Sequence, residues 1–218
     1  MNGIFEAYRS SIGKKFVIAV TGIILFLFVL GHMIGNLQLF AGRDVLNSYA
    51  AFLQSTGKIL WVVRIIMLTV VAVHILANLQ LFFMNLGSRP VGYRVKKTRE
   101  VSYSARTMIW SGPIIAAFVL YHLLHFTTGG AHHDFIKGDV YYVVVSGFKI
   151  WWVSAVYIVA NLLLGFHLKH GLWSWFQTLG FAHPKYNIWR KRFALLFSGL
   201  IIVGNLSMPI AVLAGWVA

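Results

Sequence analysis

Five long apolar stretches dominate this sequence of 218 residues. A bilayer-spanning helix takes about 20 mostly apolar residues, and each stretch is long enough. A segment inside the hydrocarbon must satisfy its own backbone hydrogen bonds, which a continuous apolar stretch does by forming a helix. We therefore predict an all-α membrane protein whose single domain covers residues 1–218. Its five transmembrane helices are expected at about 16–40, 60–84, 105–126, 148–172 and 193–216.

The composition excludes other classes of protein. Apolar residues make up 59% of the chain and charged residues only 11%, whereas a soluble domain has about a quarter of its residues charged. A water-soluble globule and a disordered chain are both excluded on this ground. The chain has no cysteine, so it can form neither disulfides nor cysteine-ligated iron–sulfur clusters.

The basic residues are unevenly distributed between the two sides of the predicted bundle. The chain has 19 Lys+Arg and 5 Asp+Glu, a net charge of +14. In a soluble protein this excess would suggest nucleic-acid binding, but in a membrane protein it marks the cytoplasmic side. We predict that the N-terminus is cytoplasmic, the C-terminus is outside and no nucleic acid is bound. The residues on the predicted cytoplasmic side are Arg9, Lys14, Lys15, Arg89, Arg94, Lys96, Lys97, Arg99, Arg106, Lys169, Lys185, Arg190, Lys191 and Arg192.

Each of the first four predicted helices contains histidine, and none of them contains Asp or Glu. Ionisable side chains in a membrane are costly and are therefore candidates for function. From a rise of about 1.5 Å per residue, His32 and His122 both lie roughly 24–25 Å from the inner edge. By the same measure His74 and His167 lie roughly 16 and 9 Å from it, so that tilt can bring them level. The sequence thus predicts two stacked histidine pairs.

Two imidazoles on opposite faces of one iron are the ligands of a low-spin b-type haem, and four-helix bundles supply facing ligands. We therefore predict that the first four helices form a haem-binding bundle with two haem b groups. Small residues beside the histidines would leave room for the macrocycle: Gly31, Gly35, Ala77 and Gly165. The alternative is that each histidine is only an interhelical hydrogen-bond partner. Four histidines at matching depths favour ligands over that alternative.

Four further residues are weaker candidates for contact with a haem. His125 and His170 each follow a ligand candidate by three residues, on nearly the same helix face. An interfacial or propionate-binding role suits them better than a ligand role. Arg64 and Arg106, near helix ends, suit pairing with haem propionates and equally suit snorkelling to lipid headgroups.

The motifs around these histidines resemble a known family. Gly31-His32 stands in the first predicted helix, and the sequence FHLKHGLWS over 166–174, followed by FQTLG over 176–180, stands in and after the fourth. The chain resembles, over essentially its whole length, the di-haem cytochrome b subunit of succinate dehydrogenase and fumarate reductase.

The resemblance implies that His32 and His122 hold an outer haem and that His74 and His167 hold an inner one. It also implies a membrane anchor in the bacterial inner membrane, which binds a flavoprotein subunit and an iron–sulfur subunit on the cytoplasmic side. Succinate is then oxidised on these partners, as part of the respiratory chain and the tricarboxylic acid cycle. Electrons reach a quinone, usually menaquinone, through the haems, and fumarate reduction is the reverse.

One position departs from the family pattern. Some fumarate-reducing members carry a Glu two residues before the fourth-helix ligand, where this chain has Gly165. Asp44, just after the first helix, is then the acid nearest the outer haem. It is a candidate proton acceptor beside a quinone, and a plain solvated loop residue is the alternative.

Two alternative functions are compatible with the sequence. One is a di-haem anchor of another quinone-linked oxidoreductase, such as nitrate reductase, although the fourth-helix motif argues against it. The other is a haem-free transporter or assembly protein that uses its histidines for protons or metal.

Overall fold

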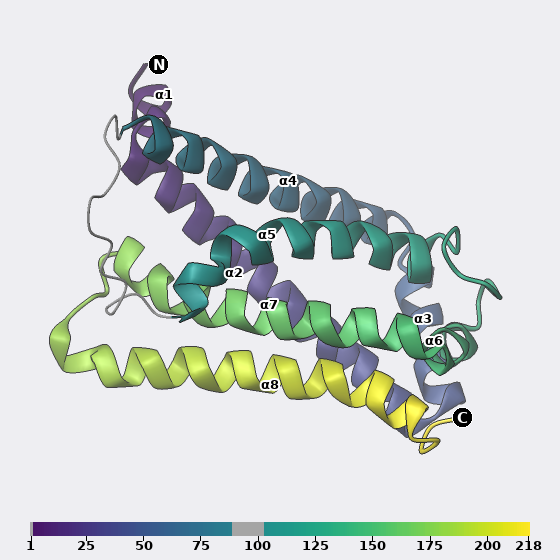
Figure 1. Cartoon of the computed structure of the whole chain (residues 1–218). Helices are drawn as coiled ribbons and strands as arrows, with labels where there is room; N and C mark the ends of the chain where they lie inside the picture. Colours follow the sequence, from purple (N-terminus) through teal and green to yellow (C-terminus); the bar gives the residue numbers. More distant parts are fainter. Residues whose placement is uncertain (1, 89–102) are drawn as a thin grey trace.

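A computed structural model of the chain describes residues 2–88 and 103–218 (Figure 1). Every regular element in this part of the chain is helical. The elements are α1 (Asn2–Arg9), α2 (Ser11–Asn36), the 3-10 helix η1 (Leu37–Ala41), α3 (Arg43–Ser55), α4 (Lys58–Gly87), α5 (Tyr103–His122), the π-helical turn η2 (Leu123–Thr127), α6 (Val140–Lys149), α7 (Trp151–Thr178), the 3-10 helix η3 (Pro184–Tyr186) and α8 (Asn187–Leu213).

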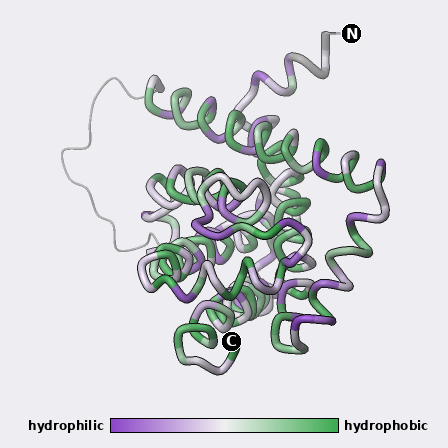
Figure 2. The backbone as a smooth tube through the Cα atoms, turned by 90° about the vertical axis from the view of Figure 1, so that its right-hand side faces the viewer, coloured by the Kyte–Doolittle hydropathy of each residue, from purple (hydrophilic) through white to green (hydrophobic). Residues whose placement is uncertain are grey.

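Five of the described helical segments are long and apolar enough to cross a membrane, which confirms the predicted class of fold. Hydrophobic residues run along most of their length (Figure 2). The first three extend past the predicted stretches at both ends, whereas the fourth begins at Trp151 and the fifth ends at Leu213, inside the predicted bounds. The segments are Ser11–Ala41, Lys58–Gly87, Tyr103–Thr127, Trp151–Thr178 and Pro184–Leu213.

The long helices pack as two pairs with an additional helix at the side. α2 packs closely against α4, and α5 against α7, while α8 lies along α7 and also contacts α2 (Figure 1). Buried residues Phe26 of α2, Leu168 of α7 and Ile201 of α8 form one core cluster where these three helices meet. α4 is different, because Ala77 is its one buried residue. Its apolar side chains therefore face outwards or towards the space between the helix pairs.

The segment before the fourth long helix is a separate helix that the sequence reading did not predict. The predicted helix began at 148, but α6 ends at Lys149 and α7 begins at Trp151. Ile150 between them has extended backbone angles, φ −80° and ψ 109°. The side chain of Asp139 caps α6 by accepting a hydrogen bond from the backbone N–H of Tyr142 at 3.1 Å. That cap was the available sequence signal for the start of α6.

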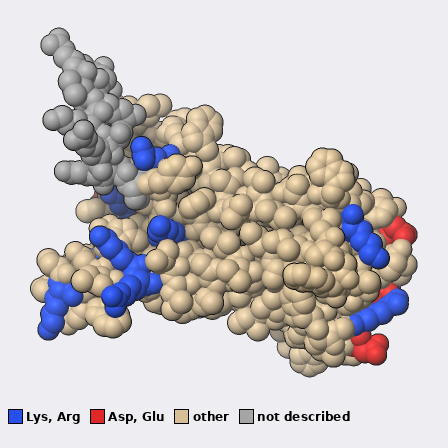
Figure 3. Space-filling model, turned by 60° about the horizontal axis from the view of Figure 1, so that its bottom comes forward, with Lys and Arg blue, Asp and Glu red and all other residues tan. Residues whose placement is uncertain are grey.

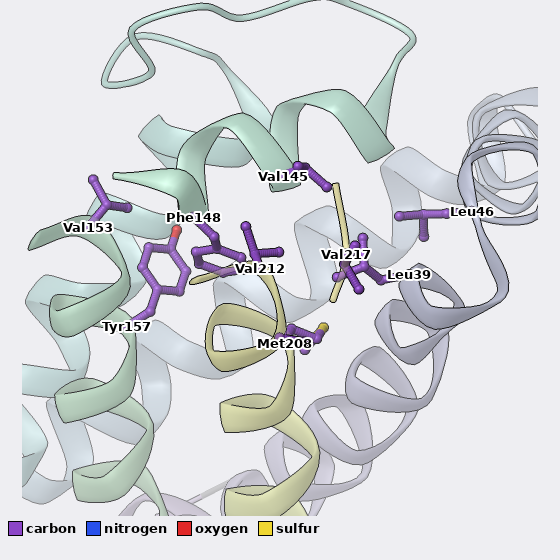
Figure 4. Packing of buried hydrophobic residues seen from close by; sticks show 10 residues of the cluster. Leu39, Leu46, Val145, Phe148, Val153, Tyr157, Met208, Val212 and Val217 are labelled. Carbon is purple, nitrogen blue, oxygen red and sulfur yellow. The ribbon is translucent and has the colours of Figure 1, made fainter. Parts of the chain in front are cut away.

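A polar network joins α6 to α3 at one end of the bundle, which we call the cap end. Arg43 of α3 forms an ion pair with Asp139. Asn47 donates to Asp139 Oδ1 at 2.8 Å and accepts from the backbone N–H of Tyr141 at 2.9 Å. Although desolvation raises the pKa of Asp139, the hydrogen bonds from Asn47 and Arg43 outweigh it and lower that pKa overall. The apolar cluster beneath, with Leu46 of α3, Val145 of α6 and Val212 of α8, completes the cap end (Figure 4).

Charged side chains divide between the two ends of the molecule. Lys and Arg gather at the end that holds α1 and the connection between α7 and α8, which we call the basic end (Figure 3). Asp44 of α3 and the loop residues Asp134 and Asp139 lie at the opposite, cap end, where Figure 3 shows some Lys or Arg side chains as well. Five of the basic residues predicted to be cytoplasmic lie outside the described residues: Arg89, Arg94, Lys96, Lys97 and Arg99.

Replacing Asp139 with Ala should destabilise the protein by about 1 kcal/mol, because α6 loses its N-terminal cap. Asp139→Asn keeps a capping oxygen and loses the charge, so it should cost less. A carboxylate with a lowered folded-state pKa stabilises fully above its unfolded value of about 4 and loses that contribution as pH falls through the folded value. The gap in stability between wild type and Asp139→Asn should therefore close in acid. Denaturant unfolding in detergent measures both effects, and equal stability of wild type and Asp139→Ala contradicts them.

Candidate functional site

His32 of α2 and His122 of α5 lie together towards the cap end. Their ring centroids are 5.8 Å apart and their planes are nearly perpendicular, at 89°. His74 of α4 and His167 of α7 form a second pair, with centroids 6.4 Å apart and planes at 64°. The structure thus brings together the same partners that the predicted depths of the histidines paired. Their role as metal ligands stays a prediction.

The separation within each pair suits a metal ion between the rings. A metal–imidazole bond is about 2 Å long, so two imidazoles on opposite sides of one ion have centroids about 6 Å apart. Both observed separations are close to this value. Each pair also joins one helix of the α2/α4 pair to one helix of the α5/α7 pair, across a boundary where α2 does not pack closely on α5, nor α4 on α7, in the described chain.

The imidazoles keep accessible surface although they lie well inside the spans. His32 is exposed, and His74, His122 and His167 are half-buried. The protein's own side chains therefore do not enclose the rings, which is what a flat group between the two helix pairs would require.

Hydroxyl groups hold the Nδ1 atoms of three of the four rings. Nδ1 of His74 lies 2.9 Å from Thr21 Oγ1 on α2. Nδ1 of His122 lies 3.3 Å from Tyr157 Oη, and Nδ1 of His167 lies 3.4 Å from Ser111 Oγ. Engaging Nδ1 leaves Nε2, on the other side of the ring, for a metal ion.

The Thr21 contact also fixes which nitrogen of His74 carries the proton. Thr21 donates its hydroxyl hydrogen to the backbone carbonyl of Val17 at 2.7 Å. Its oxygen must then accept from His74, so Nδ1 carries the hydrogen and Nε2 has a free lone pair. Gly22, beside Thr21, lies against the same ring, since a Cβ there would be in van der Waals contact with His74 Cε1 at 3.4 Å.

His32 is the exception among the four. Its Nε2 lies 3.0 Å from the side-chain nitrogen of Asn36, one helical turn further along α2. Its ring also stacks on Phe28, with centroids 5.5 Å apart and planes at 12°. The Asn36 amide must turn away, or the imidazole must turn over, before Nε2 of this ring can bind a metal.

The small residues do not serve as the sequence suggested. We expected Gly31, Gly35, Ala77 and Gly165 to make room for a macrocycle. Ala77 is fully buried, at 0% exposure, so protein atoms fill the space beside it. The three glycines differ from one another. A Cβ at Gly165 would meet Ile202 of α8, so this glycine permits close packing of α7 on α8. A Cβ at Gly35 would lie 2.7 Å from the Tyr49 hydroxyl, so this glycine accommodates α3. Of these three, Gly31 alone has open space beside it.

The four weaker candidates for contact with a haem differ in their exposure and in their position along the helices. His125 is 1% exposed, so protein atoms fill the space around it. His170 is half-buried. Arg64 is exposed and lies over the Trp61 ring, with its guanidinium carbon 5.1 Å from the centroid. Arg106 is exposed at the start of α5, at the opposite end of that helix from His122.

Asp44 lies at a groove on the cap end. It is exposed in the first turn of α3. The groove has a volume of about 520 Å³ and is lined by Gln38, Asp44, Val45, Ser48, Tyr49 and Phe52. Its walls therefore combine apolar side chains with hydroxyl, amide and carboxylate groups.

Sequence reasoning missed three residues of the site, Thr21, Ser111 and Tyr157. A hydroxyl residue within an apolar helix gives no periodic signal, and its partner lies 35 to 56 residues away in the sequence. No group of three or more His, Asp or Glu residues is placed to hold a metal ion in the described ranges. No protein-family model, curated protein or solved structure matches this chain.

Replacing Gly147 of α6 with Ala tests the tight enclosure of His125. The added Cβ would lie 2.9 Å from His125 Cε1 and 3.1 Å from His132 Nε2. Overpacking of this kind typically costs about 1–3 kcal/mol. Gly199→Ala is the matched control, because a Cβ at Gly199 in α8 meets nothing within 4 Å. Denaturant unfolding should show a loss for Gly147→Ala only, and an equal effect of both changes contradicts the enclosure.

Proposed function

We propose that this chain is a di-haem cytochrome b, the membrane anchor and electron-transfer subunit of a succinate:quinone oxidoreductase. The observation that carries the proposal is that four helices bring together two histidine pairs. The ring centroids are 5.8 Å apart in one pair and 6.4 Å apart in the other. When bound, haem supplies reversible one-electron chemistry at two depths of the bundle. The assignment of succinate as electron donor rests on the motifs around Gly31 and over 166–180.

In this proposal each histidine has a defined partner. His32 and His122 would hold the outer haem through opposite faces, and His74 and His167 the inner one. Thr21, Ser111 and Tyr157 orient the rings through Nδ1. The exposed Arg64 and Arg106 and the half-buried His170 are candidates for contact with propionates, a role that the enclosed position of His125 does not favour.

The absence of carboxylates from the spans favours this proposal over a transporter. Proton-coupled transporters commonly relay protons through intramembrane Asp, Glu and His residues. None of the five apolar segments contains Asp or Glu. A proton relay through the spans would therefore have to use the histidines without intramembrane carboxylates.

The distribution of charge supports the proposed orientation and partners. We assign the basic end to the cytoplasm of a bacterial cell, following the preference of Lys and Arg for that side. The same surface would dock the flavoprotein and iron–sulfur subunits, because basic groups steer an acidic partner. A di-haem anchor of another oxidoreductase, such as nitrate reductase, would share these features and differ in its partner.

The groove at the cap end is our candidate for the quinone site. It is an open, shallow depression whose lining combines apolar side chains with hydroxyl, amide and carboxylate groups. Tyr49 lines it and also packs against Gly35, three residues after His32. We propose that menaquinone or another quinone binds there, with Asp44 as the nearby proton acceptor.

The visible spectrum of the purified complex tests the proposed function. We expect a reducible b-type spectrum with two haems per chain and reduction by succinate. Single changes of His32, His74, His122 or His167 to Ala should each remove one haem. A colourless but folded preparation would contradict the proposal and favour the haem-free transporter. Two haems that succinate fails to reduce, even with partner subunits bound, would favour another oxidoreductase.

Thr21→Val removes the hydroxyl that accepts from His74 and keeps the shape of the side chain. Removing such a partner of a metal ligand typically weakens metal binding about 10- to 100-fold. We therefore expect weaker retention of the inner haem and normal retention of the outer one.

Thr69→Val is the matched control for this change. Thr69 of α4 donates to the backbone carbonyl of Ile65 at 2.9 Å and has no hydrogen bond to a histidine in the described chain. The haem-to-protein ratio, measured during titration with a haem-binding competitor, checks both variants. Equal haem loss in the two would contradict the assigned role of Thr21.

A further inference from the structure

Tyr157 of α7 is almost fully buried, at 4% exposure, in the cluster beneath the cap end. Its ring packs edge-on against Phe118 of α5 and Phe148 of α6, with centroids 4.9 and 5.0 Å away. Figure 4 shows it beside Phe148, between α7 and α6. This packing from two neighbouring helices fixes the position of the phenol ring.

The Tyr157 oxygen lies between two imidazoles. It is 3.3 Å from Nδ1 of His122 and 3.1 Å from Nδ1 of His125. A phenol has one hydrogen to donate and can accept as well. It can therefore donate to one of these rings while it accepts from the other.

The direction of these hydrogen bonds follows from the proposed function, on which this inference rests. If Nε2 of His122 binds iron, the hydrogen of the neutral ring stays on Nδ1, and His122 donates to the Tyr157 oxygen. Tyr157 must then donate its own hydrogen to Nδ1 of His125. His125 in turn carries its hydrogen on Nε2.

We propose that Tyr157 is a positioning residue that fixes the tautomer and orientation of His122 and thereby lowers the potential of the outer haem. Accepting a hydrogen bond from Nδ1 makes the ring a more basic ligand, and a more basic ligand favours oxidised iron. Donation from Tyr157 to His125 places more negative charge on the phenol oxygen, so that the two hydrogen bonds reinforce each other.

The series of hydrogen bonds from His122 through Tyr157 ends at His125, which packs against residues of the cap end. His125 stacks on Tyr121 and on His132, with centroids 5.3 and 4.8 Å apart. His132 is held through both nitrogens: Nδ1 accepts from the backbone N–H of Asp134 at 3.0 Å, and Nε2 lies 2.9 Å from the Val143 carbonyl. Because Nδ1 accepts, Nε2 carries the hydrogen and donates to that carbonyl. The position of His122 is thus tied to loops outside the span.

Tyr157→Phe tests the proposal because it removes the hydroxyl and keeps the ring. We expect both haems to remain, the midpoint potential of the outer haem to rise, and its low-spin EPR signal to shift. A tenfold change in the oxidised-to-reduced ratio corresponds to about 59 mV for one electron, and removal of a ligand's partner has effects of about this size. The inner haem serves as an internal reference and should not change.

Tyr121→Phe is the matched control. The Tyr121 hydroxyl is buried in the same cluster and has no hydrogen-bond partner among the described residues. Its removal should leave the potentials and EPR signals of both haems unchanged. Equal shifts in the two variants, or an unchanged outer haem in Tyr157→Phe, would overturn the proposal.

Tyr157→Phe leaves Nδ1 of His125 buried without a hydrogen-bond partner, which destabilises the fold. A second variant therefore separates loss of folding from loss of the hydrogen bond to His122. In the double variant Tyr157→Phe/His125→Leu both polar partners are removed, which is typically less costly than removing one. The rise in potential should persist there, and unfolding of both variants would show a purely structural role and overturn the proposal. A wild-type protein without haem would instead refute the proposed function, so the two failures are distinguishable.

Discussion

An imidazole in a hydrocarbon environment must find a hydrogen-bond partner. This bundle is arranged around four imidazoles. Thr21, Ser111 and Tyr157 each come from a helix next to that of the histidine they serve. The close pairing of α2 with α4 supplies Thr21 to His74, and the pairing of α5 with α7 supplies the other two contacts. The helix pairs therefore engage Nδ1 of three rings, whereas His32 is bonded through Nε2 to Asn36 of its own helix.

The remaining elements hold these two pairs in place. α8 carries no histidine, yet it packs closely along α7 and is tied to it by a hydrogen bond of 3.0 Å from Asn205 to Asn161. Asn161 also donates to the backbone carbonyl of Tyr157 at 2.9 Å. At the cap end, α3 and α6 lock together through Asp139. The site is thus supported by contacts that lie outside it.

The sequence was sufficient for the spans and for the histidine partners because both depend on distance along a helix. Apolar length defines a span, and the rise per residue places His32 level with His122. It was not sufficient for α6, because its 10 residues are too few to span a membrane and no proline marks the break at Ile150. The roles of Gly35 and Gly165 were misassigned for a related reason: what a glycine faces depends on packing against α3 and α8, which spacing along one helix does not contain.

The Asn36 contact makes the two histidine pairs unequal. At the inner pair, Thr21 fixes the proton on Nδ1 of His74, so Nε2 of that ring is already a lone-pair donor. At the outer pair, Nε2 of His32 is bound to the Asn36 amide at 3.0 Å. That nitrogen is thus engaged by a side chain of the protein itself, whereas Nε2 of His74 has no such partner in the described chain. The two pairs, alike in their spacing, therefore differ in the hydrogen bonding of their imidazole nitrogens.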